Sequence, residues 1–250
     1  MSGHSKWSQI KRQKGANDAK RGAVFTKVAR EIAIAARAGG GDPDGNFRLR
    51  LAIEKARSVN MPADNIKRAI EKAAGGDKAE QYEEIVYEGY GPGGVAIVVE
   101  TATNNRNRTA ADIRSYFTKA GGQLAGAGAV AWQFEPRGVV SVPRDRQDPD
   151  DVALVAIDAG AEDVDTDSDP MEITTQPGDM ERIRIALEAA GISVESVELT
   201  LQPKATVEID GTHARQNLRL IDMLEEHDDV QRVTANFEVP DEVLAEAASA

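Results

Sequence analysis

The sequence has 250 residues, with 30 Lys and Arg against 42 Asp and Glu, and a formal net charge of -12. Its length and its 41% of hydrophobic residues allow one large domain or two to three small ones, and the lack of cysteine excludes disulfides, thiolate nucleophiles and thiolate metal sites. No apolar run approaches the roughly 18 residues that span a bilayer, and the start has no apolar signal core, so we expect a cytoplasmic protein without a membrane partner.

The first part of the chain is predicted to form three helices behind a basic arm. Helical spacing of apolar residues and the break at GGGDPDGN predict helices over 17–37, 46–58 and 62–74. Asn17 or Asp18 can cap the first helix, and Gly75 with Gly76 can end the third. The segment before Asn17 has no apolar periodicity, so we interpret it as a flexible arm.

The pattern changes after residue 77 to strands that alternate with helices. EEIVYEGYGP and GVAIVVETAT predict two strands around a tight glycine-rich loop, followed by a helix from 103 or 104 to 120, a glycine loop and a strand over 130–134. From Gly138 the predicted order is β-α-β-β-α-β, which is that of a ferredoxin-like unit. A short strand near Val207, a helix over 212–226 and a strand over 232–239 lack a core of their own.

We therefore predict an α+β multidomain fold. The last elements are expected to complete the sheet begun near residue 82, which makes the ferredoxin-like unit an insertion. The expected domains are a helical one with its basic arm, a middle α+β one and an inserted ferredoxin-like one, over 1–77, 78–136 plus 203–240, and 137–202.

The charge is divided unevenly along the chain. Residues 1–78 hold 17 basic and 8 acidic residues, whereas the other 172 hold 13 and 34. Such polarity is typical of a surface that binds polyanions. Mobile Lys and Arg neutralise phosphates, and an aromatic among them can stack on a base. The candidate nucleic-acid-binding residues are Lys6, Trp7, Lys11, Arg12, Lys14, Lys20, Arg21, Lys27 and Arg30.

A second candidate contact lies at the start of the helix after residue 103. TNNRNRT places Arg106 and Arg108 at a helix N-terminus, which favours phosphate, although Asn and Thr are also ordinary capping residues. GAGAVA (126–131) follows a helix and enters a strand, which is the wrong context for a dinucleotide site. Four alternating aspartates from Asp163 to Asp169 are interpreted as one solvated strand face. We find no catalytic constellation and expect no metal, no cofactor and no small-molecule substrate.

Several motifs in this order resemble the YebC family. They are GHSKWSQIKRQKGANDAKRG (3–22), FTKVAREI, AARAGGGDPDGNFRLR (35–50), NMPADNIKRAI (60–70), YEGYGPGG (87–94) and NNRNRT (104–109). The resemblance implies three domains, the last inserted in the middle one, and a non-enzymatic role in gene expression. The resemblance implies that Lys6, Trp7, Lys11, Lys14, Lys20 and Arg21 of the basic arm occupy positions that the family pattern keeps. Two departures are Arg12-Gln13 in the arm and Ala129 where the family's glycine loop usually has serine.

The family is described both as DNA-binding transcriptional regulators and as ribosome-associated factors that help translation of difficult stretches such as consecutive prolines. The family's label as probable transcriptional regulators favours DNA, so the leading hypothesis is a DNA-binding regulator. A factor that binds ribosomal RNA, or an acidic module that binds basic proteins, are the alternatives. Nothing in the sequence decides between DNA and the ribosome.

Overall fold

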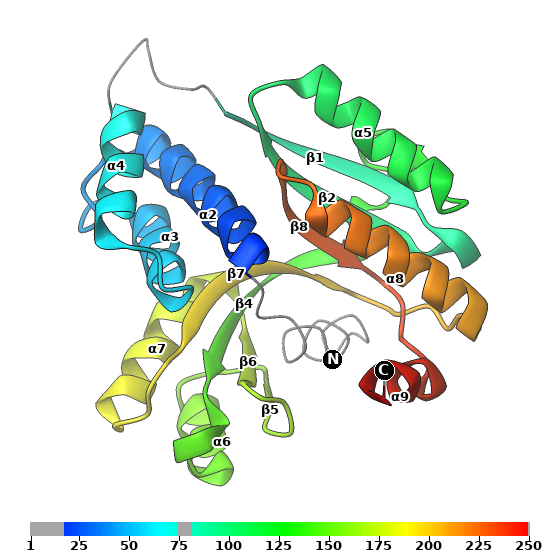
Figure 1. Ribbon diagram of the computed structural model, residues 1–250. Coiled ribbons are helices and arrows are strands. Elements are labelled where there is room, and N and C mark those ends of the chain that lie inside the picture. The colour runs from blue at the N-terminus through cyan, green and yellow to red at the C-terminus, as the bar shows by residue number, and fades with distance from the viewer. Residues whose placement is uncertain (1–17, 75–81, 250) are drawn as a thin grey trace.

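The computed structural model describes residues 18–74 and 82–249 (Figure 1). Its first part is helical, with α2 Asp18–Gly39, α3 Phe47–Ser58 and α4 Ala63–Ala74, which confirms the three predicted helices. Their apolar stripes enclose a core that includes Ile32, Leu49 and Ala56. Within the described ranges, no helix has the length and apolar character needed to cross a membrane.

Asn46 joins the end of α2 to the start of α3. Its Oδ1 accepts the backbone N–H of Leu49 at 3.1 Å, while its Nδ2 donates to the carbonyls of Ala35 and Gly40, each at 2.8 Å. A Cβ at Gly39 would lie 2.7 Å from this amide, so the passage requires glycine. The GGGDPDGN segment is therefore a specific helix-to-helix connection.

The second part is built on an antiparallel sheet in the order β3-β1-β2-β8. Its strands are β1 Glu83–Tyr90, β2 Ala96–Thr103, β3 Gln123–Ala125 and β8 Val230–Ala235. Helices α5 Arg106–Lys119 and α8 Gly211–Glu226 pack on one face around Ile97, Phe117 and Leu220. The pairing of β8 with β2 confirms that the last elements return to the sheet begun by β1.

The third part is a second antiparallel sheet in the order β5-β6-β4-β7. Its strands are β4 Phe134–Val142, β5 Asp163–Asp165, β6 Met171–Thr175 and β7 Ser196–Pro203. Helices α6 Pro149–Asp158 and α7 Met180–Ala189 cover it through Val152, Ile183 and Leu187. The sequence β4-α6-β5-β6-α7-β7 confirms the ferredoxin-like unit, and it lies between β3 and α8 in the chain.

Several elements differ from the predictions. The predicted strand over 130–134 is a short 3₁₀ turn, Ala131–Gln133, and β4 then runs unbroken from Phe134 to Val142. Val207 forms only an isolated bridge with Phe237. Strand β3 and helix α9 Asp241–Ser249 had no counterpart in the prediction.

The alternating aspartates do not share one strand face. Asp163 and Asp165 lie in β5, but Asp167 and Asp169 lie in the following turn, where Asp165 Oδ1 accepts the N–H groups of Asp167 and Ser168. The carboxylate is thus used to cap a turn, a local hydrogen bond that competes with strand extension. Among the described residues, no group of three or more His, Asp or Glu side chains is placed to hold a metal ion.

The glycine loop before β4 wraps around the carboxylate of Glu88. Glu88 lies on β1 and is 5% exposed, and it accepts the backbone N–H groups of Gly128, Val130 and Ala131 at 2.7–2.8 Å. Burial alone would raise the pKa of Glu88, but the three donors stabilise the charged form and the pKa is lowered overall. The loop is therefore the tight backbone passage expected from GAGAVA, held by a buried acid.

Replacing Glu88 by Gln is expected to lower the free energy of unfolding by about 1.5–3 kcal/mol, because a charged acceptor with three donors is lost. Since the folded pKa lies below the ordinary one, the stabilisation is complete above a pH of about 4.3 and is lost as the pH falls through the folded pKa. Urea unfolding of both proteins at several pH values measures this. Glu195→Gln, at an exposed site, is the control. If the difference in free energy of unfolding between wild type and Glu88→Gln did not shrink in acid, the ionised Glu88 carboxylate would not be the acceptor that holds the loop.

Candidate nucleic-acid interface

Most of the predicted basic arm lies outside the residues that the structure describes. Five predicted residues fall there, namely Lys6, Trp7, Lys11, Arg12 and Lys14. Lys20 and Arg21 belong to the first turn of α2, but their side chains are also outside the description. The described members of the predicted site are Lys27, Arg30, Arg106 and Arg108, and their surroundings define the candidate interface.

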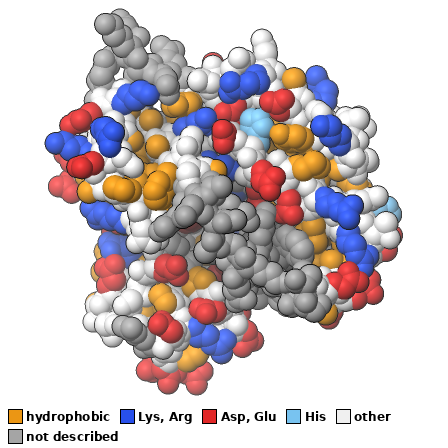
Figure 2. All heavy atoms as spheres, viewed as in Figure 1, with side chains coloured by type: hydrophobic (Ala, Val, Ile, Leu, Met, Phe, Trp, Pro, Cys, Tyr) orange, Lys and Arg blue, Asp and Glu red, His pale blue; other side chains and the backbone are white. Residues whose placement is uncertain are grey.

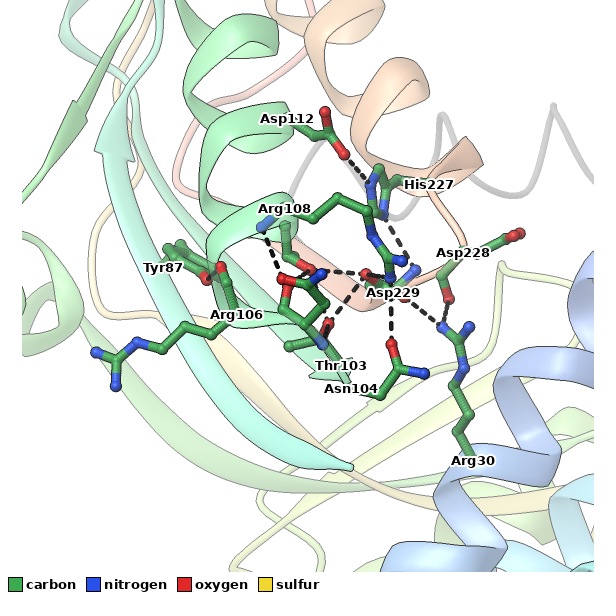
Figure 3. Close-up of polar contacts among 12 residues, drawn as sticks. Arg30, Tyr87, Thr103, Asn104, Arg106, Arg108, Asp112, His227, Asp228 and Asp229 are labelled. Carbon is green, nitrogen blue, oxygen red and sulfur yellow. Dashed lines mark hydrogen bonds and ion pairs between the residues drawn. The ribbon is translucent and has the colours of Figure 1, made fainter. Parts of the chain in front are cut away.

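A buried aspartate joins α2 to the start of α5 (Figure 3). Asp229 follows α8 and its side chain is 1% exposed. Arg30 of α2 donates from Nη1 to Asp229 Oδ1 at 2.8 Å, and Arg108 of α5 donates from Nη2 to Oδ2 at 2.9 Å. One carboxylate thus orients two of the predicted arginines, which come from helices far apart in the sequence.

Two hydroxyl groups complete the shell around this carboxylate. The Oγ1 atoms of Thr103 and Thr109 lie 3.1 and 2.6 Å from Asp229 Oδ2 and donate to it. Burial would raise the pKa of Asp229, but hydrogen bonds from Thr109 and Arg108, together with the charge of Arg30, lower it overall. The carboxylate therefore stays ionised, and its two arginines stay fixed.

Helix α2 is also attached through Lys27 and through a second contact of Arg30. Lys27 Nζ donates to the carbonyl of Glu225 at the end of α8, and Arg30 Nη1 donates to the carbonyl of Asp228. The Arg30 guanidinium lies 5.4 Å from the ring centroid of Tyr82, within the range of a cation–π contact. The structure thus uses these two predicted phosphate ligands in contacts within the chain.

The start of α5 presents its other arginine to solvent. Asn105 caps the helix by accepting the N–H of Arg108 at 3.2 Å, and Thr103 Oγ1 accepts the N–H of Asn105 at 2.9 Å. Among the described residues, none forms an ion pair or a side-chain hydrogen bond with the Arg106 guanidinium. Figure 3 shows it pointing away from Asp229. The Arg108 side chain is 50% exposed even with its ion pair. Two cations therefore remain accessible at a helix N-terminus, where anions are favoured.

His227 holds the loop that carries Asp229. Its Nδ1 accepts the backbone N–H of Asp229 at 3.1 Å, and its Nε2 lies 3.2 Å from Asp112 Oδ2 on α5. Both contacts are satisfied by the neutral ring with its proton on Nε2. The ring edge also faces Tyr116, with 6.0 Å between ring centroids. His227 is therefore a structural residue that fixes α5 against the end of α8.

Comparison with known proteins places this architecture in a family. One family model, described as the TACO1/YebC protein N-terminal domain, matches residues 5–76, and another, described as the TACO1/YebC second and third domain, matches residues 82–237. The chain belongs to the TACO1/YebC family. The confirmed resemblance extends over both the helical part and the two sheets.

Relatives and a solved structure agree with this assignment. A protein of Rubrobacter xylanophilus is 55% identical over 99% of this chain and 100% of its own length, and one of Pelotomaculum thermopropionicum is 51% identical over 96% and 100%. Each is named a probable transcriptional regulatory protein. A crystal structure titled as a conserved hypothetical protein from Aquifex aeolicus has a TM-score of 0.85 and 45% identity, covering 91% of this chain and 94% of that one.

The sequence located the cations of this junction but missed the acid between them. TNNRNRT signalled both the cap and the two arginines of α5. Asp229 stands in a plain acidic run, HDDV, which carries no motif. Its role comes from the return of β8 to β2, which brings the end of α8 beside α2 and α5.

Replacing Asp229 by Asn is expected to lower the free energy of unfolding on the order of 3 kcal/mol, because Arg30 loses its charged partner in a largely buried position. Asp228→Asn is the matched control, since the side chain of Asp228 is exposed; it should change stability by less than about 0.5 kcal/mol. Urea denaturation followed by circular dichroism compares the two. Equal effects would show that the Asp229 carboxylate does not hold the junction.

Proposed function

We propose that the chain is a non-enzymatic, nucleic-acid-binding regulator of gene expression, with duplex DNA as its target. The observation that carries the proposal is the division of charge. The first 78 residues hold 17 basic and 8 acidic residues, and residues 137–202 hold 5 and 16. Figure 2 shows acidic side chains gathered at the lower end of the viewed face, where α6 and β5 lie. A polyanion would be attracted to one end of the molecule and repelled from the other.

The junction at Asp229 extends this basic surface to α5. Because Arg30 and Arg108 share one carboxylate, the middle of α2 and the start of α5 are linked through Asp229, and Arg106 is exposed at the start of α5. We propose the exposed Arg106 as a second phosphate contact, at the start of α5. We assign affinity to Lys6, Lys11, Arg12 and Lys14, with Trp7, Lys20 and Arg21 beside them. Lys27 and Arg30 serve mainly to fix α2.

The choice of duplex DNA is supported by the names of the relatives, which are called probable transcriptional regulatory proteins. Phosphate contacts give affinity and position without sequence information, so base specificity would have to come from other contacts. The proposed role of the acidic units is to orient the bound complex by repulsion.

The intact chain is expected to bind a 30-base-pair duplex with an affinity that falls steeply with salt. Six to eight neutralised phosphates give a log–log slope of roughly -5 to -7. Changing Lys6, Lys11, Arg12 and Lys14 to Glu should abolish binding. Fluorescence anisotropy from about 50 to 200 mM salt covers the informative range. A flat salt dependence would contradict the proposal. No duplex binding, with co-sedimentation on ribosomes from a DNase-treated lysate, would reassign the target to ribosomal RNA.

Arg106→Glu is expected to weaken duplex binding about tenfold or more, because it replaces one attraction to phosphate by one repulsion at the helix N-terminus. Lys119→Glu makes the same change of charge at the other end of α5, where the side chain is also exposed. It should have an effect of less than about threefold. The two variants are compared by anisotropy at one salt concentration. Equal losses would mean that only net charge matters and that the start of α5 is no contact.

A further inference from the structure

A cavity of about 420 Å³ lies where the three parts of the molecule meet. Its walls come from α2 and α3, from the face of β1, β2 and β8 that is turned away from α5 and α8, and from β7 with the start of α7. Figure 1 shows α3 beside β7 and α7 at this point. The volume is within the range of small-molecule sites, and junctions between domains are common places for them.

Each cation in the cavity wall already has a carboxylate partner. Lys55 of α3 lies 3.0 Å from Glu31 of α2, and Arg48 of α3 donates to Glu84 of β1 at 2.9 Å. Arg232 of β8 lies 2.5 Å from Glu198 of β7. These pairs join the three parts across the cavity, and they leave little capacity there to bind an anion.

One further carboxylate in the wall, that of Glu100, has no such partner within the part of the chain that the structure describes. Glu100 lies on the central strand β2, opposite Val86 of β1 and Arg232 of β8 in the register. Among the described residues, none forms a hydrogen bond or a close ion pair with its carboxylate. The four carboxylates and three cations named here leave one excess negative charge, centred on a half-buried group.

The electrostatic surroundings of Glu100 agree with this imbalance. Burial raises the pKa of Glu100, which is the largest effect on it. Arg232 and Lys55 act in the opposite direction, while Glu84 and Glu31 raise the pKa further. The net result is a raised pKa, because burial outweighs the attraction of Arg232 and Lys55, and a cation bound beside the carboxylate would stabilise its ionised form.

The rest of the cavity wall is largely apolar. Phe47 and Val86 are 40% and 51% exposed, and Leu199 of β7 is 50% exposed. Large side chains of this kind are normally covered where they gather at a concave surface. An apolar wall beside one uncompensated carboxylate is complementary to a ligand with a hydrocarbon stem and a single positive end.

We propose that this cavity binds a primary ammonium group on an apolar stem, with Glu100 as the carboxylate that receives it. The same chemistry is found in free alkyl diamines and in a lysine side chain of another polypeptide. The proposal goes beyond the nucleic-acid function and does not depend on it. The site is anionic and involves none of the arginines around Asp229.

The test uses the full chain, labelled with ¹⁵N and on its methyl groups, titrated with n-pentylamine and with n-pentanol. The amine is expected to shift the methyl signals of Val86 and Leu199 saturably, and the alcohol of similar shape is expected to bind at least tenfold more weakly. Glu100→Gln should weaken amine binding at least tenfold. Glu195→Gln, the same loss of charge at an exposed site outside the cavity, should leave it within twofold.

A second variant tests the cavity without changing charge. Leu199→Trp adds bulk at a half-exposed position in the wall, and it should remove amine binding while leaving the melting temperature unchanged. Equal binding by wild type and Glu100→Gln, or shifts that never saturate, would overturn the proposal. Titrations with 1,5-diaminopentane and with Nα-acetyl-lysine-N-methylamide distinguish a free diamine from a lysine side chain as the natural source of the ammonium group. Tighter binding of the diamine supports a free amine, and tighter binding of the lysine derivative supports a protein partner.

Discussion

The arrangement of the described molecule depends on one buried ion cluster, in which the Asp229 carboxylate is shared by Arg30 and Arg108. A carboxylate that is 1% exposed is stable only with charged and hydrogen-bonded partners, and here they come from α2, α5 and the end of β2. The cluster fixes the orientation of the helical part relative to the first sheet. It also makes one surface of α2 and the exposed start of α5.

The same cluster shows that the basic residues do not all have the same role. A count of charge alone treats every Lys and Arg near the N-terminus as equal. The structure divides them, because Lys27 and Arg30 are engaged by carbonyls and a carboxylate of the chain, while Arg106 is free of such partners among the described residues. Under the proposed function, affinity for a polyanion would thus depend on the arm and on the start of α5. Such a division separates the cations that build the surface from those that can contact a ligand.

Much of the fold could be predicted from the sequence, because local patterns and strand order agreed with each other. The helical spacing in 17–74 and the β-α-β-β-α-β order were strong signals, and the lack of a core at the C-terminal end predicted the return of β8. Family motifs supported the same order. The failures have local causes. β4 continues through Pro136 because β7 pairs with it along its length, and Asp165 caps a turn where alternation alone predicted a strand.

The candidate sites were less predictable because long-range contacts build them. Nothing in the sequence indicated that Glu88 binds the glycine loop, because 40 residues separate Glu88 from Gly128, the first of its donors. Asp229 and Glu100 are ordinary acids in the sequence. Only the assembled topology decides that Asp229 has two arginine partners and that Glu100 has no close ion-pair partner among the described residues. Chain pattern predicts which elements form, whereas the partners of a buried charge follow from the assembled topology.

The long pair of strands β4 and β7 couples the unfolding of the two sheets. Phe134 at one end of β4 packs with Ala96 and Val98 of the first sheet, while Val142 at the other end belongs to the core under α6 and α7. Eight consecutive residue pairs, from Phe134–Pro203 to Ser141–Ser196, join the strands between. A break in this ladder would expose both cores, so the two sheets should melt as one unit. The described contacts of the helical part to the sheets run through side chains, among them Arg30, Arg48 and Leu51, so its loss would expose Asp229 and part of the second core without breaking a strand ladder.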